Sequence, residues 1–235
     1  MPPTAHTPNG EPPHPLPRTL EPEAMDSEDE AREYLKMDHA TVNNAFVDDL
    51  IASGPVGTKV MDLGCGTGEI PVLLCQRLSD VQVMGVDIAI EMLDVARLEV
   101  ELGGVQGRVF LEHADCKALD HFEANSTDTV ISNTLVHHVP DPTEVLRCAK
   151  HVLARGGRLF IRDLARPLTE SRVEELVQLH ASTETPFAQQ LLRQSLHAAL
   201  TIDEIAAIAE TCGLDNAEIS MTSDRHWTMH WTKPA

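Results

Sequence analysis

Hydrophobic positions follow two periods along most of the chain. Short apolar runs predict strands near residues 59–63, 82–86, 108–112, 129–133 and 158–163. Stretches with apolar residues three and four positions apart predict helices near residues 70–78, 90–102 and 142–153. Strands and helices therefore alternate, which is typical of a parallel sheet with helical crossover connections.

Both ends of this pattern carry further elements. We expect a helical lead-in over residues 27–53, whose second half has apolar residues at helical spacing. Residues 167–200 predict two helices that Pro186 separates, and Thr201 with Glu204 matches a capping box for a helix that ends at Gly213. Gly156 and Gly157 are expected to stop the helix over 142–153. The last two apolar runs, near residues 217–222 and 226–232, predict an antiparallel pair of strands.

These elements predict an α/β fold with a doubly wound, seven-stranded sheet that is mainly parallel and has an antiparallel C-terminal strand pair. We expect one domain over residues 25–235, in which residues 166–200 form a helical insert that roofs a pocket. Glu184, Gln190, Ser195 and His197 lie in this insert, although an ordinary packing unit would have the same pattern. Residues 1–24 are rich in proline and poor in large apolar side chains, so we expect a disordered tail.

The composition limits the classes of binding partner and the cellular location that we expect. With 37 acidic and 18 basic residues the formal charge is -19, which would repel a nucleic-acid backbone. The five cysteines are scattered and form no C-x-x-C pair, so we expect neither a disulfide framework nor a zinc site. No signal peptide and no membrane-crossing run is evident, and we expect a cytoplasmic protein without membrane attachment.

A glycine-rich turn follows the first predicted strand. Asp62-Leu63-Gly64-Cys65-Gly66-Thr67-Gly68 joins that strand to a helix, and its glycines let the main chain approach a ligand closely. The spacing is G-x-G-x-G, whereas the dinucleotide fingerprint is G-x-G-x-x-G. This difference favours a ligand without a pyrophosphate. Asp87 ends the next strand, 19 residues after Gly68, where a carboxylate can accept hydrogen bonds from a ribose diol. A plain strand–helix turn and a helix cap are the alternatives for the two features.

With these motifs the chain resembles the class I S-adenosylmethionine-dependent methyltransferases, and in particular the group similar to ubiquinone and menaquinone biosynthesis methyltransferases. Residues 62–68 and Gly85-Val86-Asp87-Ile88 carry most of the resemblance. Ala114-Asp115-Cys116, His137-His138-Val139 and the run from Leu153 to Leu159 extend it in the same order, so that it covers roughly residues 56–161. The resemblance implies a Rossmann-like fold, S-adenosyl-L-methionine as cofactor and methyl transfer as the activity.

The resemblance also assigns roles around the cofactor. Gly64, Gly66 and Gly68 would border its methionine part, and Asp62 would help to organise the ammonium group. Asp87 would bind the ribose hydroxyls, Asp115 the adenine amino group, and Asn133 would lie beside the sulfonium. The implied cofactor-binding residues are Asp62, Gly64, Cys65, Gly66, Gly68, Asp87, Ile88, Met92, Asp115, Cys116 and Asn133.

The acceptor side is less specific, because methyl transfer needs alignment and, for some acceptors, removal of a proton. One of His137 and His138 is a candidate general base, and a packing turn is the alternative. As a metal pair they are weak, because adjacent histidines are expected to point in different directions and no third ligand is evident. Arg162 and Asp163, with Arg166, could bind an anionic acceptor or form an ion pair that locks the insert. The candidate catalytic residues are His137, His138, Arg162, Asp163 and His226.

The sequence favours a methyltransferase for a small-molecule acceptor and leaves two alternatives. A protein that binds S-adenosylmethionine without catalysis would need the same cofactor residues. An NAD(P)-dependent oxidoreductase shares the fold and the ribose carboxylate but needs the wider glycine spacing. The methylated atom (O, N, C or S) and the oligomeric state are open.

Overall fold

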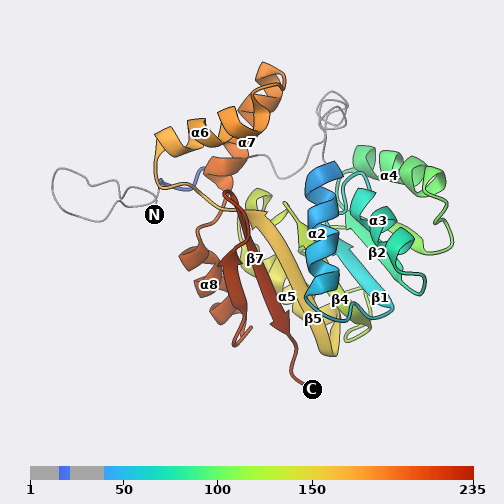
Figure 1. The fold of residues 1–235 in the computed structure, drawn as a ribbon. Helices are drawn as coiled ribbons and strands as arrows, with labels where there is room; N and C mark the ends of the chain where they lie inside the picture. Colours follow the sequence, from blue (N-terminus) through green and yellow to red (C-terminus); the bar gives the residue numbers. More distant parts are fainter. Residues whose placement is uncertain (1–15, 22–39) are drawn as a thin grey trace.

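The computed structural model describes residues 16–21 and 40–235, which build one seven-stranded sheet in the order β3-β2-β1-β4-β5-β7-β6 (Figure 1). Among the strands of these residues, only β7 runs antiparallel to its neighbours, β5 and β6. The predicted mainly parallel sheet with an antiparallel C-terminal pair is therefore confirmed. The strands are β1 (Lys59–Leu63), β2 (Gln82–Asp87), β3 (Val109–His113), β4 (Thr127–Asn133), β5 (Leu153–Leu164), β6 (Glu218–Met221) and β7 (His226–Thr232).

Helices cover both faces of the sheet, because successive strand residues point to opposite sides. Val130 packs in the core beneath α5 and α8, and its neighbour Ile131 packs in the core beneath α2 and α3. The crossover helices lie where the periodicity predicts them. The helices are α2 (Ala40–Ala52), α3 (Glu69–Arg77), α4 (Ile90–Leu102), α5 (Pro142–Val152), α6 (Glu170–Ala181), α7 (Pro186–Ala198) and α8 (Ile202–Thr211), and η1 (Val136–His138) is a short 3-10 turn.

The insert after β5 forms two helices, as predicted, and they lie beyond the end of the sheet (Figure 1). The Thr185 side chain caps α7 by accepting from the Ala188 N–H, and Pro186 occupies the first turn, where its missing N–H costs nothing. Val173, Leu176 and Leu196 pack α6 and α7 together in a small core of their own. The capping box of Thr201 and Glu204 is present at the start of α8.

The predicted helix stop at Gly156 and Gly157 is wrong. Helix α5 ends at Val152, and β5 begins at the next residue, so that the two glycines lie inside the strand. Leu153 already pairs with Thr127 of β4, and the Gly156 N–H donates to the Lys233 carbonyl at 2.8 Å. Hydrogen bonds to the chain on both sides, toward β4 and toward the end of β7, therefore extend β5 through these residues.

Residues 16–21 fall within the predicted disordered tail, yet they pack against the domain. Arg18 donates to four main-chain oxygens, those of Ala198, Pro140, His137 and Val139. The prediction rests on the many prolines and the few large apolar side chains, whereas a guanidinium with several carbonyl partners can also order a polar segment. The remainder of the predicted tail, and the predicted helix start near residue 27, lie outside the described residues.

The order of the strands in the sheet indicates where a ligand would bind. From β1 the sheet grows through β2 and β3 in one direction and through β4 and β5 in the other. Ligands of such sheets bind beyond the carboxyl ends of the strands at this reversal. Within the described ranges, no helix combines the length and apolar character that crossing a bilayer requires.

Candidate functional site

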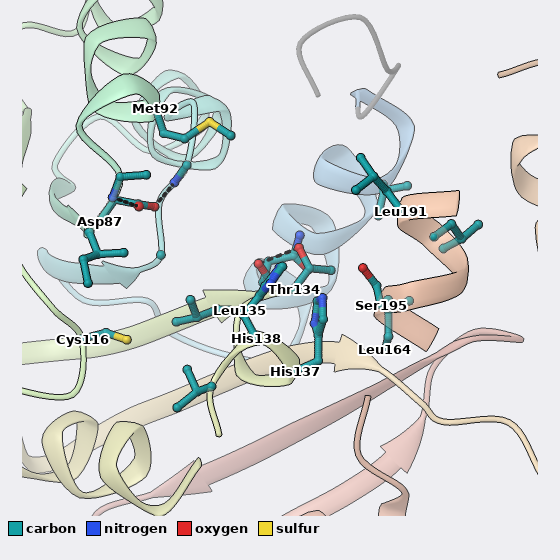
Figure 2. Close-up of a pocket in the computed structure, with 18 of the residues that line it drawn as sticks. Asp87, Met92, Cys116, Thr134, Leu135, His137, His138, Leu164, Leu191 and Ser195 are labelled. Atoms are coloured by element: carbon teal, nitrogen blue, oxygen red, sulfur yellow. Dashed lines mark hydrogen bonds between the residues drawn. The ribbon is translucent and has the colours of Figure 1, made fainter. Parts of the chain in front are cut away.

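The glycine loop between β1 and α3 is tied to the end of β2. The N–H groups of Gly64 and Cys65 donate to the Val86 carbonyl at 2.9 and 3.1 Å. Asp87, the last residue of β2, accepts from the Gly66 N–H at 2.8 Å and from the Ala89 N–H at 2.9 Å (Figure 2). Its carboxylate therefore holds the glycine loop and the start of α4 in one position.

At two positions of this loop the structure explains why the residue is glycine. Gly66 has a φ of 51°, which is unfavourable for other residues, and a Cβ built on it would meet no protein atom within 4 Å. Its open side belongs to a cavity. Gly68 lets α3 pack closely on α4, since a Cβ would lie 3.0 Å from the Ala96 Cβ.

Two carboxyl groups lie under and beside the loop. Asp62 is only 2% exposed, and its burial, with the nearby Asp87 charge, raises its pKa well above the usual range. Burial also raises the pKa of Asp87, although hydrogen bonds from the Ala89, Gly66 and Ile88 N–H groups oppose the rise. A positively charged or hydroxyl-bearing ligand would stabilise both carboxylates.

One cavity of about 300 Å³ extends from the glycine loop to the inserted helices (Figure 2). Of the residues predicted from the sequence, it is lined by Gly64, Gly66, Asp87, Ile88, Met92, Asp115, Cys116, Asn133, His137, His138 and His226. Asp62, Cys65, Gly68, Arg162 and Asp163 are not among its lining residues. The insert contributes Glu184 and Ser195, as expected, but Gln190 and His197 do not line the cavity.

The polar side chains that follow β3 and β4 differ in their hydrogen-bond partners. Asp115 accepts from the Lys117 N–H at 2.9 Å and pairs with its ammonium at 3.2 Å. Burial raises the pKa of the Cys116 thiol to about 12, so that it stays neutral. The Asn133 Oδ1 is buried and accepts no hydrogen bond from the described residues. An unsatisfied buried acceptor beside a cavity suits a ligand that donates to it.

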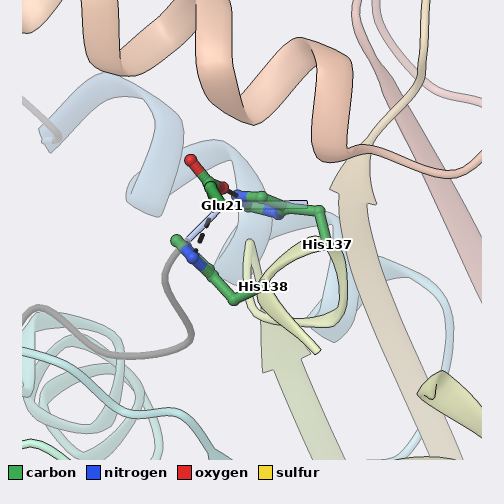
Figure 3. A group of neighbouring side chains, drawn as sticks. All are labelled: Glu21, His137 and His138. Atoms are coloured by element: carbon green, nitrogen blue, oxygen red, sulfur yellow. Dashed lines mark ion pairs between the residues drawn. The ribbon is translucent and has the colours of Figure 1, made fainter. Parts of the chain in front are cut away.

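His137 and His138 lie in η1, directly after β4, and face the same carboxylate (Figure 3). Glu21 Oε1 is 3.2 Å from His137 Nε2 and 3.3 Å from His138 Nδ1. The two rings are in contact, with centroids 4.2 Å apart and planes tilted by 33°. The expectations that adjacent histidines diverge and that a third ligand is lacking are both wrong, because the chain turns tightly here and the N-terminal segment supplies Glu21.

Asp163 contacts His137 at the ring nitrogen opposite the one that faces Glu21. Its carboxylate accepts from His137 Nδ1 at 2.5 Å and from the His137 main-chain N–H at 3.2 Å. Burial alone would lower the pKa of His137, but Asp163 and Glu21 together raise it to about 9. Burial would likewise raise the pKa of Asp163, but the His137 charge and hydrogen bond hold it below its usual range. Asp163 therefore orients His137 and does not itself face the cavity.

The two arginines expected near the acceptor have structural partners instead. Arg162 donates to Thr228 Oγ1 at 2.9 Å and to Asp49 Oδ2 at 2.7 Å, on the face of the sheet that α2 covers. Neighbouring strand residues point to opposite faces, so Arg162 and Asp163 cannot both reach one site. Arg166 donates to the Ala199 carbonyl and pairs with Glu204, which locks the insert to α8. Binding of an anionic acceptor by either arginine is thus not supported.

His226 lines the cavity at the start of β7 and is neutral. Burial, reinforced by Arg225, lowers its pKa to about 4. Its Nδ1 lies 2.9 Å from the Ser223 hydroxyl. Sequence reasoning misses several other lining residues, because their types and spacing carry no motif; among them are Val42, Asn43, Thr134, Leu135, Leu191 and Leu192.

The chain is similar in sequence to known methyltransferases. The family model described as a methyltransferase domain matches residues 56–223. The chain is 36% identical over 114 residues to a ubiquinone biosynthesis O-methyltransferase of Xanthomonas axonopodis pv. citri, across 48% of this chain and 45% of that protein. It is 30% identical over 179 residues to the 27-O-demethylrifamycin SV methyltransferase of Amycolatopsis mediterranei, across 76% and 61%. The chain thus spans about half to three fifths of the length of these relatives.

Solved structures share the fold. A putative S-adenosyl-L-methionine-dependent methyltransferase from Methanococcus maripaludis superposes with a TM-score of 0.71 at 17% identity, over 92% of this chain and 98% of that one. A phosphoethanolamine N-methyltransferase 2 from Haemonchus contortus, in complex with S-adenosyl-L-methionine, gives a TM-score of 0.66 at 21% identity, over 87% and 56%. The Rossmann-like fold class is therefore confirmed.

Proposed function

Because this chain belongs to the methyltransferase domain family, whose model matches residues 56–223, we propose that it transfers the methyl group of S-adenosyl-L-methionine to a hydroxyl oxygen of a small organic acceptor. One observation carries the proposal: the open side of Gly66, the Asp87 carboxylate and the unsatisfied Asn133 Oδ1 face one cavity that continues to His137 and His138. One relative is an O-methyltransferase by name, and the name of the other gives a 27-O-demethyl compound as its substrate, which supports oxygen as the methylated atom.

The residues around the cavity fit this cofactor. Gly64 and Gly66 offer main chain to the methionine part, and a Cβ at Gly66 would occupy the open space. Asp87 retains lone pairs for the ribose diol after accepting from the N–H groups of Gly66 and Ala89. The buried Asp62 and the free Asn133 oxygen favour the positively charged end of the ligand. Ile88 and Met92 would flank the ribose and adenine, Asp115 would accept from the adenine amino group, and the main chain of Cys116 would lie nearby.

When bound, this cofactor supplies a methyl carbon that the acceptor oxygen attacks in line as the carbon–sulfur bond breaks. The contribution of the chain is then mainly alignment and exclusion of water. The acceptor would lie between the histidine pair and the apolar side chains of Leu164, Leu191 and Leu192. This apolar wall and the -19 formal charge favour a neutral, partly apolar small molecule over a nucleic acid. Both ring nitrogens of His137 face carboxylates, those of Asp163 and Glu21, so His137 would shape the acceptor end of the cavity, and the proton of the acceptor hydroxyl would leave to water.

The test combines cofactor binding with turnover. Calorimetry of the full chain with S-adenosylhomocysteine should detect binding, and Asp87→Ala should weaken it at least about 100-fold, since two hydrogen bonds to a charged acceptor contribute about 3 kcal/mol or more. Asp128→Ala is a matched control, because Asp128 also accepts from two main-chain N–H groups, those of Thr58 and Lys59, but lies outside the cavity. Its affinity should equal that of the wild type.

Turnover separates the alternatives. Incubation with S-adenosylmethionine and a panel of phenols and hydroxylated small molecules should yield S-adenosylhomocysteine and a methyl ether, detected by mass spectrometry. Tight cofactor binding without a product across the panel would favour a catalytically silent binding protein. Binding of NADH with a change in its fluorescence, and no binding of S-adenosylhomocysteine, would favour an oxidoreductase and contradict the proposal.

A further inference from the structure

Three ligand-type side chains from two distant segments meet at the acceptor end of the cavity. Glu21 comes from residues 16–21, and His137 and His138 come from η1 (Figure 3). The potential ligand atoms, one from each residue, all lie within 4.8 Å of one another. Imidazole nitrogens with a carboxylate oxygen form a ligand set that zinc and similar divalent ions use in catalytic sites.

Two of the three separations between the ligand atoms match those of a metal site. Bonds of about 2.0–2.1 Å at tetrahedral angles place neighbouring ligand atoms roughly 3.3–3.4 Å apart. Glu21 Oε1 is 3.2 Å from His137 Nε2 and 3.3 Å from His138 Nδ1. The two histidine nitrogens lie within 4.8 Å of each other, so a small movement of the imidazole rings would place all three atoms around one ion.

Asp163 prepares His137 for ligation. It accepts from Nδ1 at 2.5 Å, which leaves Nε2 directed at Glu21. A carboxylate on the far nitrogen of a ligating histidine is the usual partner in metal sites, where it fixes the tautomer and orients the ring. Both Asp163 and His137 are buried, so this orientation is held rigidly.

The carboxylate of Glu21 is buried and only half satisfied. Its side chain is 7% exposed, and Oε2 lies 3.2 Å from the Ser195 hydroxyl. Oε1 has no hydrogen bond of regular geometry among the described residues, and its nearest polar neighbours are the two histidine nitrogens at 3.2 and 3.3 Å. A buried anionic oxygen in this state is costly unless a cation compensates it. Arg18, anchored to the carbonyls of His137 and Val139, holds the segment in place.

We propose that Glu21, His137 and His138 bind a divalent transition-metal ion of the Zn²⁺ class at the acceptor end of the cavity. Three protein ligands leave an open position for water or substrate. His137 and His138 both line the cavity, so this position is directed to the acceptor space. That the acceptor hydroxyl takes the open position rests on the proposed methyl transfer; the binding of the ion does not.

The test measures the ion itself, without cofactor or acceptor. The purified full chain, stripped with a chelator, is titrated with Co²⁺ and followed by visible absorption, and Zn²⁺ affinity is measured by competition with a chromophoric chelator. We expect one ion per chain. Changes to the shell around a ligand typically weaken binding about 10–100-fold, so Glu21→Gln and His138→Gln, which remove ligands, should each weaken it at least about 100-fold.

A matched control is His121→Gln. His121 Nε2 and Glu112 Oε1 are also 3.2 Å apart, but this pair is exposed and belongs to no three-residue cluster of metal-ligating side chains within the described residues. Its replacement should leave the affinity and the stoichiometry unchanged. Circular dichroism and S-adenosylhomocysteine binding of each variant show whether it is folded, so that lost metal binding cannot arise from unfolding.

Two results would overturn the proposal. The first is a wild type that neither Co²⁺ nor Zn²⁺ saturates, in which case a proton on the histidine pair is the compensating cation. The second is equal affinity of the wild type, Glu21→Gln and His138→Gln for these ions, which would place the ions elsewhere on the acidic surface. In both cases retained S-adenosylhomocysteine binding would leave the proposed function intact.

Discussion

Replacing Gly66 with alanine distinguishes an effect on cofactor binding from an effect on stability. The added Cβ would meet no protein atom within 4 Å, so the folded chain can accommodate it at the cost of a φ of 51°. That left-handed conformation costs about 1–2 kcal/mol for a residue with a side chain. For a chain of this size the melting temperature should fall by roughly 3–6 °C.

The substitution should weaken cofactor binding more than it lowers the stability of the fold. The new methyl group occupies the space that we assign to the methionine part of S-adenosylmethionine. An extra methyl group in a well-packed site costs about 1–3 kcal/mol, which is roughly a 5- to 150-fold loss of affinity. Isothermal titration of Gly66→Ala with S-adenosylhomocysteine measures this loss directly.

Gly104→Ala provides the matched control. Gly104 has a φ of 68°, and a Cβ on it would also meet nothing within 4 Å, but it follows α4 outside the cavity. The two variants should therefore lose similar stability, and Gly104→Ala should bind the ligand as the wild type does. If Gly66→Ala bound S-adenosylhomocysteine with unchanged affinity, the ligand would not lie against this loop and the reasoning would be refuted.

Three further predictions concern charged and titratable groups. The pKa of His226, about 4 in the fold, lies below its ordinary value, so its contribution to stability is complete above about pH 6.5 and is lost as the pH falls toward 4. The free energy of unfolding, measured in urea, falls between pH 7 and pH 5. This fall should be about 2 kcal/mol smaller for His226→Gln than for the wild type. Arg166→Ala should lower the free energy of unfolding by about 3 kcal/mol, because it removes a buried guanidinium that holds Ala199 and Glu204. Arg172→Ala removes exposed contacts with Glu175 and Asp224 and should change this free energy by less than about 1 kcal/mol. Arg18→Ala should speed hydrogen exchange at the Thr19 amide, which donates to His197, at least about tenfold, since a charged hydrogen bond contributes about 1.5–3 kcal/mol.

Each of these predictions has a contrary result. Equal acid sensitivity of wild type and His226→Gln would mean that the ring is protonated in the fold. Unfolding of Arg166→Ala at the wild-type urea concentration would mean that the insert is held by its apolar core alone. Unchanged exchange at Thr19 would mean that Arg18 does not anchor residues 16–21.

The fold and the cofactor end of the cavity are largely predictable from the sequence, because local patterns determine them. Strand β1, helix α4 and strand β7 begin and end at the predicted residues. The glycine spacing and Asp87 belong to consecutive strands whose carboxyl ends must meet at one edge of a parallel sheet.

The acceptor end is less predictable, because its residues meet through tertiary contacts. Glu21 lies in a proline-rich segment without a core pattern, and tertiary contacts, among them the hydrogen bonds of Arg18 with distant carbonyls, place it beside the histidines. Arg162 and Asp163 are adjacent in the sequence and invite a shared role, yet a strand directs neighbours to opposite faces. Strand alternation along β5 is therefore sufficient to separate the two side chains.

A crystal structure of the full chain grown with saturating S-adenosylhomocysteine tests the central claim most directly. We predict the ribose hydroxyls on Asp87, the amino-acid part against Gly64 and Gly66, and the thioether sulfur directed past Asn133 toward the histidine pair. An empty cleft under these conditions, or a ligand bound away from Asp87 and the glycine loop, would contradict the account.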